Sequence, residues 1–81
     1  MIYLRKKAVN NHEIIYDYQI NNKGEFGTVR YNLDENKLYW DKSATGNYET
    51  EPECYRNHAV QKILEYNEKK VFPESEVVYW Y

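Results

Sequence analysis

Three short polar segments divide the first half of the chain, and they constrain its fold more than any other feature. The segments are Asn10-Asn11-His12, Asn22-Lys23-Gly24 and Asp34-Glu35-Asn36. Each contains residues that tolerate left-handed backbone, and the runs between them are rich in β-branched and aromatic residues. The pattern predicts an antiparallel meander of four strands, at about Ile2–Val9, Glu13–Asn21, Glu25–Leu33 and Lys37–Lys42.

A helix is predicted after the meander. Thr50-Glu51-Pro52-Glu53 supplies an N-cap threonine, a glutamate three residues later and a proline in the first turn. Lys69 and Lys70 suit the negative end of such a helix. Apolar residues recur along it at helical spacing, at Tyr55, Ala59, Val60, Ile63, Leu64 and Tyr66.

The helix should pack across one face of the sheet. Pro73 follows it, and Val77–Tyr81 then reads as a short strand at one edge of the meander, although the sequence does not say which edge. We therefore expect an α+β fold in a single domain, residues 1–81: a four-stranded antiparallel meander, one covering helix and a short C-terminal strand.

The strand register follows if each turn is a three-residue loop. The predicted opposite pairs are Ile2/Ile20, Leu4/Tyr18, Arg5/Asp17, Ala8/Ile14, Ile20/Phe26, Tyr16/Arg30, Arg30/Trp40 and Asn32/Leu38. The covered face then collects Ile2, Leu4, Ala8, Ile14, Tyr16, Tyr18, Ile20, Phe26, Leu38 and Trp40. The open face collects Tyr3, Arg5, Lys7, Ile15, Asp17, Gln19, Val29, Tyr31, Tyr39 and Asp41.

Composition excludes several classes of protein. Ten tyrosines, two tryptophans and two phenylalanines supply much of the apolar surface of the 81 residues, enough for a small core. The net charge of −2 lacks the basic excess that binding a phosphate backbone requires. The only cysteine, Cys54, excludes an intramolecular disulfide and favours a reducing compartment, so we expect a cytoplasmic protein without a signal peptide or membrane span.

The open face is the candidate working surface. Tyrosine with arginine inside a ring of mixed charge is typical of protein-binding surfaces, and one helix cannot cover both faces of the sheet. The predicted partner-binding residues are Tyr3, Arg5, Lys7, Ile15, Tyr31 and Tyr39. The same residues have two other interpretations: cross-strand pairs that only stabilise the sheet, or a surface on which single-stranded nucleic acid stacks. A homodimer through this face is a further possibility.

Other candidate sites are weaker. Cys54 and His58 are four residues apart on the predicted helix, which would place a thiol and an imidazole on one side, as in a small metal or thiol site. No third ligand or orienting group accompanies them at close spacing. Glu49, Glu51 and Glu53 alternate as in a cation site, but acidic residues at this place are already explained by the positive end of the helix dipole. No glycine belongs to a phosphate-binding pattern.

The sequence therefore favours a protein that is not an enzyme and needs no cofactor. We expect a cytoplasmic protein-binding module that modulates or inhibits a partner protein of unknown identity, in the manner of small inhibitor, immunity or anti-defence proteins. Single-stranded nucleic-acid binding is the first alternative, and the Cys54/His58 site is the second.

Overall fold

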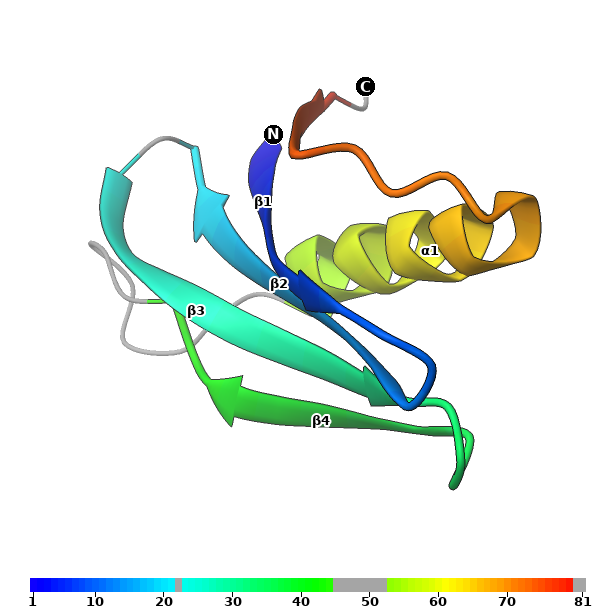
Figure 1. The fold of residues 1–81 in the computed structure, drawn as a ribbon. Helices are drawn as coiled ribbons and strands as arrows, with labels where there is room; N and C mark the ends of the chain where they lie inside the picture. Colours follow the sequence, from blue (N-terminus) through cyan, green and yellow to red (C-terminus); the bar gives the residue numbers. More distant parts are fainter. Residues whose placement is uncertain (22, 45–52, 80–81) are drawn as a thin grey trace.

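The computed structural model describes residues 1–21, 23–44 and 53–79, which form an antiparallel sheet with one helix packed on it (Figure 1). In chain order the elements are β1 (Ile2–Val9), β2 (Glu13–Ile20), β3 (Lys23–Asn32), β4 (Lys37–Lys42), α1 (Glu53–Lys69) and β5 (Ser75–Val78). The five strands lie in the order β4-β3-β2-β1-β5. The predicted α+β fold, a meander with one helix and a short last strand, is confirmed.

The last strand joins the sheet beside the first. β5 pairs antiparallel with β1, with Ile2 opposite Val78 and Arg5 opposite Ser75. It begins two residues before the predicted strand, whose last residues, Trp80 and Tyr81, lie outside the described part of the chain. The predicted helix start at Thr50-Glu51-Pro52 also lies outside it. Within the described residues, no helix is long and apolar enough to cross a membrane.

The core lies between α1 and the sheet, and α1 packs on β1 and β2. From the helix, Ala59, Ile63 and Tyr66 are buried, whereas Leu64 is 42% exposed and contributes little, contrary to the predicted stripe. The buried residues of the sheet come from alternate positions of its strands, namely Ile2, Leu4, Ile14, Tyr16, Tyr18, Ile20, Val29, Tyr31 and Val78. Such alternation is expected of a sheet that is covered on one face.

The buried tyrosines each place their hydroxyl group against a polar partner. Tyr16 donates to the carbonyl oxygen of Pro73 at 2.7 Å, and Tyr66 donates to Glu76. The hydroxyl oxygen of Tyr18 accepts a hydrogen bond from the backbone N–H of Ala44 at 3.3 Å. Tyrosine can therefore replace aliphatic residues in this core, because its polar end is satisfied where its ring is buried.

The predicted register between β1 and β2 is correct over most of its length. Ile2 lies opposite Ile20, and Leu4 lies opposite Tyr18. The register shifts between Lys6 and Ala8, so that Ala8 faces Ile15 instead of the predicted Ile14. Ala8 therefore lies on the open side of the sheet with Ile15, and Val9, opposite Ile14, packs against the core instead.

Strand β3 is displaced by one residue from the prediction. Tyr16 and Trp40 both lie opposite Val29, where the prediction placed Arg30 opposite each of them. A one-residue shift turns every side chain of a strand to the other face. Val29 and Tyr31, predicted to be on the open face, are therefore buried in the core, and Phe26, predicted to be in the core, lies on the open face.

The turns account for this error. Ile20 pairs with Lys23, so the β2–β3 turn is shorter than a three-residue loop, and the register then shifts between Tyr18 and Ile20. Asn21 and Gly24 have positive φ angles there, of 52° and 78°. At the β3–β4 turn, Asn32 pairs with Lys37, which leaves a four-residue loop. The two errors cancel in β4, so Leu38 and Trp40 pack against the core as predicted.

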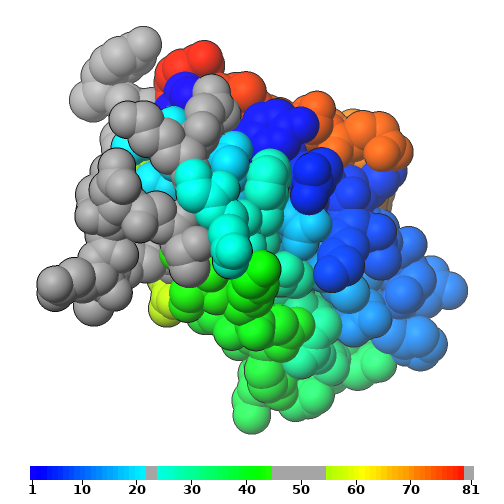
Figure 2. Space-filling view, turned by 90° about the vertical axis from the view of Figure 1, so that its left-hand side faces the viewer, coloured from blue at the N-terminus to red at the C-terminus, as the bar shows by residue number. Residues whose placement is uncertain are grey.

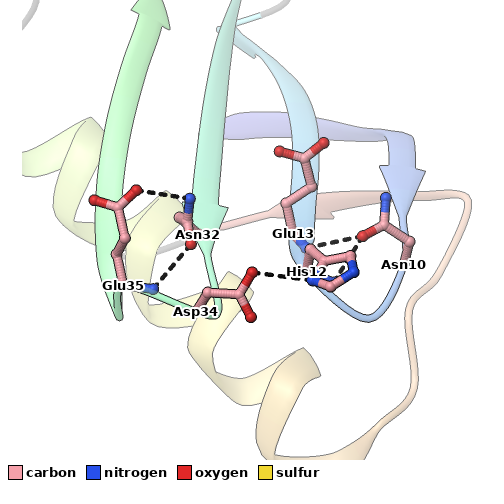
Figure 3. A network of polar contacts seen from close by, with 6 residues as sticks. All are labelled: Asn10, His12, Glu13, Asn32, Asp34 and Glu35. Carbon is pink, nitrogen blue, oxygen red and sulfur yellow. Dashed lines mark hydrogen bonds and ion pairs between the residues drawn. The ribbon is translucent and has the colours of Figure 1, made fainter.

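Two of the turns meet at one end of the sheet (Figure 3). Asn32 Oδ1 accepts a hydrogen bond from the backbone N–H of Glu35 at 2.9 Å, which closes the β3–β4 turn. His12 of the β1–β2 turn lies 3.0 Å from Asp34 of the β3–β4 turn, measured from Nδ1 to Oδ2. Both of these side chains are largely exposed, so their contact adds little stability.

Candidate functional site

The open face of the sheet is the side opposite α1, and side chains of β4, β3, β2 and β1 follow one another across it (Figure 2). We define the open face by nine residues that point away from the core: Tyr3, Arg5, Ile15, Asp17, Phe26, Thr28, Arg30, Tyr39 and Asp41. Its aromatic and aliphatic members are half-buried. The face is therefore a shallow, mixed surface of rings, guanidinium groups and carboxylates.

Phe26 is at the centre of one cluster on this face. Its ring meets that of Tyr3 edge to face, with centroids 5.9 Å apart and an interplanar angle of 78°. The guanidinium carbon of Arg5 lies 4.1 Å from the Phe26 ring centroid, which is the geometry of a cation–π contact. The three side chains come from two strands that are not neighbours, so the β1–β2–β3 register sets their arrangement.

Asp17 connects this cluster to the middle of the sheet. Its Oδ2 atom lies 3.4 Å from Arg5 Nη2, in the cross-strand pair that the sequence predicted. Its Oδ1 atom accepts a hydrogen bond from the hydroxyl of Thr28 at 2.8 Å. The Asp17 side chain is only 16% exposed and the Arg5 side chain is 50% exposed, so the carboxylate is enclosed while the guanidinium remains available.

Arg30 organises a second cluster. Its guanidinium carbon lies 4.4 Å from the ring centroid of Tyr39. Its Nε and Nη2 atoms donate to the two carboxylate oxygens of Asp41 at 2.9 and 3.2 Å, a bidentate pair. These hydrogen bonds raise the pKa of Arg30 and lower the pKa of Asp41. The Tyr39 hydroxyl donates to Glu35 at 2.7 Å, and this bond raises the pKa of Tyr39.

The structure places four of the six predicted partner-binding residues on the open face: Tyr3, Arg5, Ile15 and Tyr39. Ile15 lies opposite Arg30 and is half-buried between the two clusters. Lys7 is exposed at the register shift of β1, and its charge contributes to the lowered pKa of Asp41.

The predicted position of Tyr31 on the open face is wrong. Tyr31 is 9% exposed, belongs to the core and donates its hydroxyl hydrogen to Asn36. Phe26 and Arg30 are not among the predicted residues of the open face, because the predicted register pairs them with covered residues. The available signal was the glycine itself, since Gly24 has a positive φ angle beside the register shift between β2 and β3.

The contacts of the aromatic rings on the open face can be compared with those that single-stranded nucleic acid would need. A base that binds a sheet of this kind stacks on the flat face of an exposed aromatic ring. On the open face, Arg5 already lies over Phe26, and Arg30 already lies over Tyr39. Asp17 and Asp41 are held beside these arginines, so much of the positive charge is neutralised. Stacking of a base on Phe26 or on Tyr39 would require the guanidinium group that lies over that ring to move.

No metal site is found in the part of the chain that the structure describes. Residues 1–21, 23–44 and 53–79 hold no group of three or more His, Cys, Asp or Glu side chains that could bind an ion. His58 is half-buried on α1, and the side chain of Cys54 lies outside the described atoms. The proposed Cys54/His58 site is therefore left as a prediction.

Comparison of the chain with protein-family models, with curated proteins and with solved structures finds no match.

Proposed function

We propose that this protein is a small, non-catalytic protein-binding module that modulates or inhibits a partner protein through the open face of its sheet. The observation that carries the proposal is the pair of arginines laid over aromatic rings, Arg5 over Phe26 and Arg30 over Tyr39, on the face that α1 leaves uncovered. A cytoplasmic location forms part of the proposal, because a fold with a single cysteine does not depend on an oxidising compartment.

Preorganisation supports this use of the open face. Binding a partner immobilises flexible side chains, at about 0.5–1.5 kcal/mol for each rotamer-rich group. Arg30 is already held by two hydrogen bonds and a ring contact, and Arg5 by an ion pair and a ring contact. These two arginines therefore lose less conformational entropy on binding than arginines free in solvent. Arginine and aromatic residues are also the types that dominate binding energy at protein interfaces.

Charge balance favours a protein partner over a polyanion. Two arginines and two aspartates alternate across the open face, so the surface has no strong field of one sign. The open face continues toward β5 with an exposed apolar side chain, since Val77 lies opposite Tyr3 and is 38% exposed. A partner with apolar groups at its centre and hydrogen-bonding groups of both signs around them matches this surface.

The experiment compares capture of a partner from a lysate of the source cells by three immobilised proteins. They are the wild type, the double variant Phe26→Ser/Tyr39→Ser, and the control Leu64→Ser. Leu64 is a large apolar residue of α1 that is 42% exposed, so its replacement changes a different face in a similar way. We expect one protein to be retained by the wild type and by the control, and to be lost from the double variant.

Retention of the captured protein by all three baits would contradict the proposal, as would its loss from the Leu64→Ser control alone. Thermal melting of the double variant verifies that lost binding does not reflect lost folding. Sedimentation of the wild type measures its oligomeric state, and so tests whether the open face pairs with another copy of the chain. In that case the double variant, and not the control, would be monomeric.

A further inference from the structure

A hollow of about 380 Å³ lies at one end of the fold, between the β1–β2 turn and the end of α1. It is lined by Val9, Asn10, Asn11, Leu33, Asn67, Lys70 and Phe72. Its volume falls in the range of sites that hold small molecules, and it is separate from the open face. The lining combines three apolar side chains with three carboxamides and one ammonium group, so its hydrogen-bonding capacity can be worked out residue by residue.

Asn10 has its carboxamide oxygen occupied (Figure 3). Oδ1 accepts hydrogen bonds from the backbone N–H groups of His12 at 2.7 Å and Glu13 at 3.0 Å. These two hydrogen bonds also determine the orientation of the Asn10 amide, because its oxygen can accept hydrogen bonds from backbone N–H groups and its nitrogen cannot. What Asn10 retains for a bound molecule is its NH2 group, a donor.

Asn67 and Lys70 form a second donor pair. Lys70 Nζ donates to Asn67 Oδ1 at 2.8 Å, which again engages the carboxamide oxygen and leaves the Asn67 NH2 group. Among the described residues that line the hollow, Lys70 is the only charged one. It follows the last residue of α1, where the helix dipole contributes about −0.5 of a charge. The full positive charge of Lys70 exceeds that fraction, so these two charges together favour an anion.

The apolar part of the lining complements these donors. Val9, Leu33 and Phe72 are half-buried and pack against the core, so they form a fixed wall. We propose that the hollow binds a small carboxylic acid, with the carboxylate against Lys70, Asn67 and Asn10 and a short apolar or aromatic body against Phe72, Val9 and Leu33. The ammonium group of Lys70 and the carboxamide NH2 groups of Asn10 and Asn67 favour the ionised acid over the uncharged amide of the same shape.

The test is a titration of isotope-labelled wild-type protein, followed by amide chemical shifts, with phenylacetate and with phenylacetamide as probes. We expect saturable shifts in residues 9–11 and 67–72 with phenylacetate, with a Kd on the order of 1 mM, as suits a ligand of this size. Phenylacetamide should bind about three- to fivefold more weakly, because losing one exposed ion pair lowers the affinity by about that factor.

Two lysine variants test whether Lys70 causes the preference for phenylacetate over phenylacetamide. Lys70→Gln should weaken phenylacetate binding by about three- to fivefold and leave phenylacetamide binding unchanged. Lys69→Gln removes the same charge from the neighbouring residue, whose side chain bonds Glu65 instead of lining the hollow, and it should change neither probe. The proposal is overturned if phenylacetate gives no saturable shifts, if both probes bind equally, or if Lys69→Gln weakens phenylacetate as much as Lys70→Gln.

Discussion

The ring of Tyr18 lies directly over Gly27. A Cβ atom added to Gly27 would stand 2.6 Å from two carbons of that ring and 2.5 Å from the backbone nitrogen of Ala44. Gly27 is opposite Tyr18 in the β2–β3 pair, so the missing side chain creates the space in which the ring turns across β3 toward Trp40. The residue without a side chain thus helps to determine where the largest core side chains lie.

Gly27→Ala should therefore destabilise the fold by about 1–3 kcal/mol, the usual cost of overpacking a core. Urea denaturation measures the change in the free energy of unfolding. The control is a double-mutant cycle with Tyr18→Leu, whose smaller side chain removes the contact with the new methyl group. The cost of Gly27→Ala should be smaller in that background, and an equal cost would show that the contact with Tyr18 is unimportant.

Tyr31 and Tyr39 should respond very differently to replacement by serine. Tyr31→Ser leaves a hole in the core and should cost about 3–5 kcal/mol, as for other buried aromatic residues. Tyr39→Ser removes a ring from the open face and should cost less than about 1 kcal/mol. Thermal melting measures the loss of stability in each serine variant. Tyr31→Phe, which removes only the hydrogen bond to Asn36, should cost about 1 kcal/mol. Equal losses for the two serine variants would mean that the two faces have been assigned wrongly.

Alkaline pH should weaken the fold through its buried tyrosines. Burial, with the charges of Glu74 and Glu76, raises the pKa of Tyr16 from 10.0 to about 12. Burial and the hydrogen bond to Glu76 also raise the pKa of Tyr66. A folded-state pKa above the unfolded value means that the folded protein holds more protons in this interval. The stabilisation is complete below pH 10 and is lost as the pH rises toward 12.

Urea denaturation across that interval measures this pH dependence. Tyr16→Phe should make the free energy of unfolding fall less steeply with pH, because one of the shifted groups is gone. Tyr79→Phe is the matched control, since it removes a tyrosine hydroxyl from a side chain that is 63% exposed. A slope that is the same in all three proteins would argue against the raised pKa of Tyr16.

Nucleic-acid binding is tested by titrating the protein with short single-stranded oligonucleotides at low and moderate salt. We expect no binding at low salt, because guanidinium groups cover the rings of Phe26 and Tyr39 and carboxylates neutralise those groups. Affinity that falls steeply with added salt, and that disappears in Phe26→Ser/Tyr39→Ser, would instead support the nucleic-acid alternative.

A metal or thiol site at Cys54 and His58 is tested with Cys54→Ala and His58→Ala. We expect the purified wild type to contain no stoichiometric metal, and both variants to melt close to the wild type, within about 1 kcal/mol in stability. Metal that remains bound through purification and is lost from both variants would establish the site.

Much of the fold could be predicted from residue patterns because those signals are local. Asn and Gly at the turns, β-branched and aromatic runs, and a helical stripe of apolar residues each reflect preferences of a few neighbouring residues. The bounds of β1 and β4 were predicted to the residue, and Arg5 and Asp17 were correctly paired. The open face was therefore recognised as a mixed aromatic and basic surface.

The membership of that surface was decided by tertiary structure. Whether Tyr31 or Arg30 faces the core depends on a single residue in the β2–β3 register, and that register depends on the conformation of the backbone near Asn21 and Gly24. The hollow beside Lys70 likewise requires a turn and a helix end, far apart in the chain, to meet. The sequence by itself determined which strands and helix form, because those preferences are local. Only the tertiary structure decided which side chains share a surface, because that depends on register and packing between distant segments.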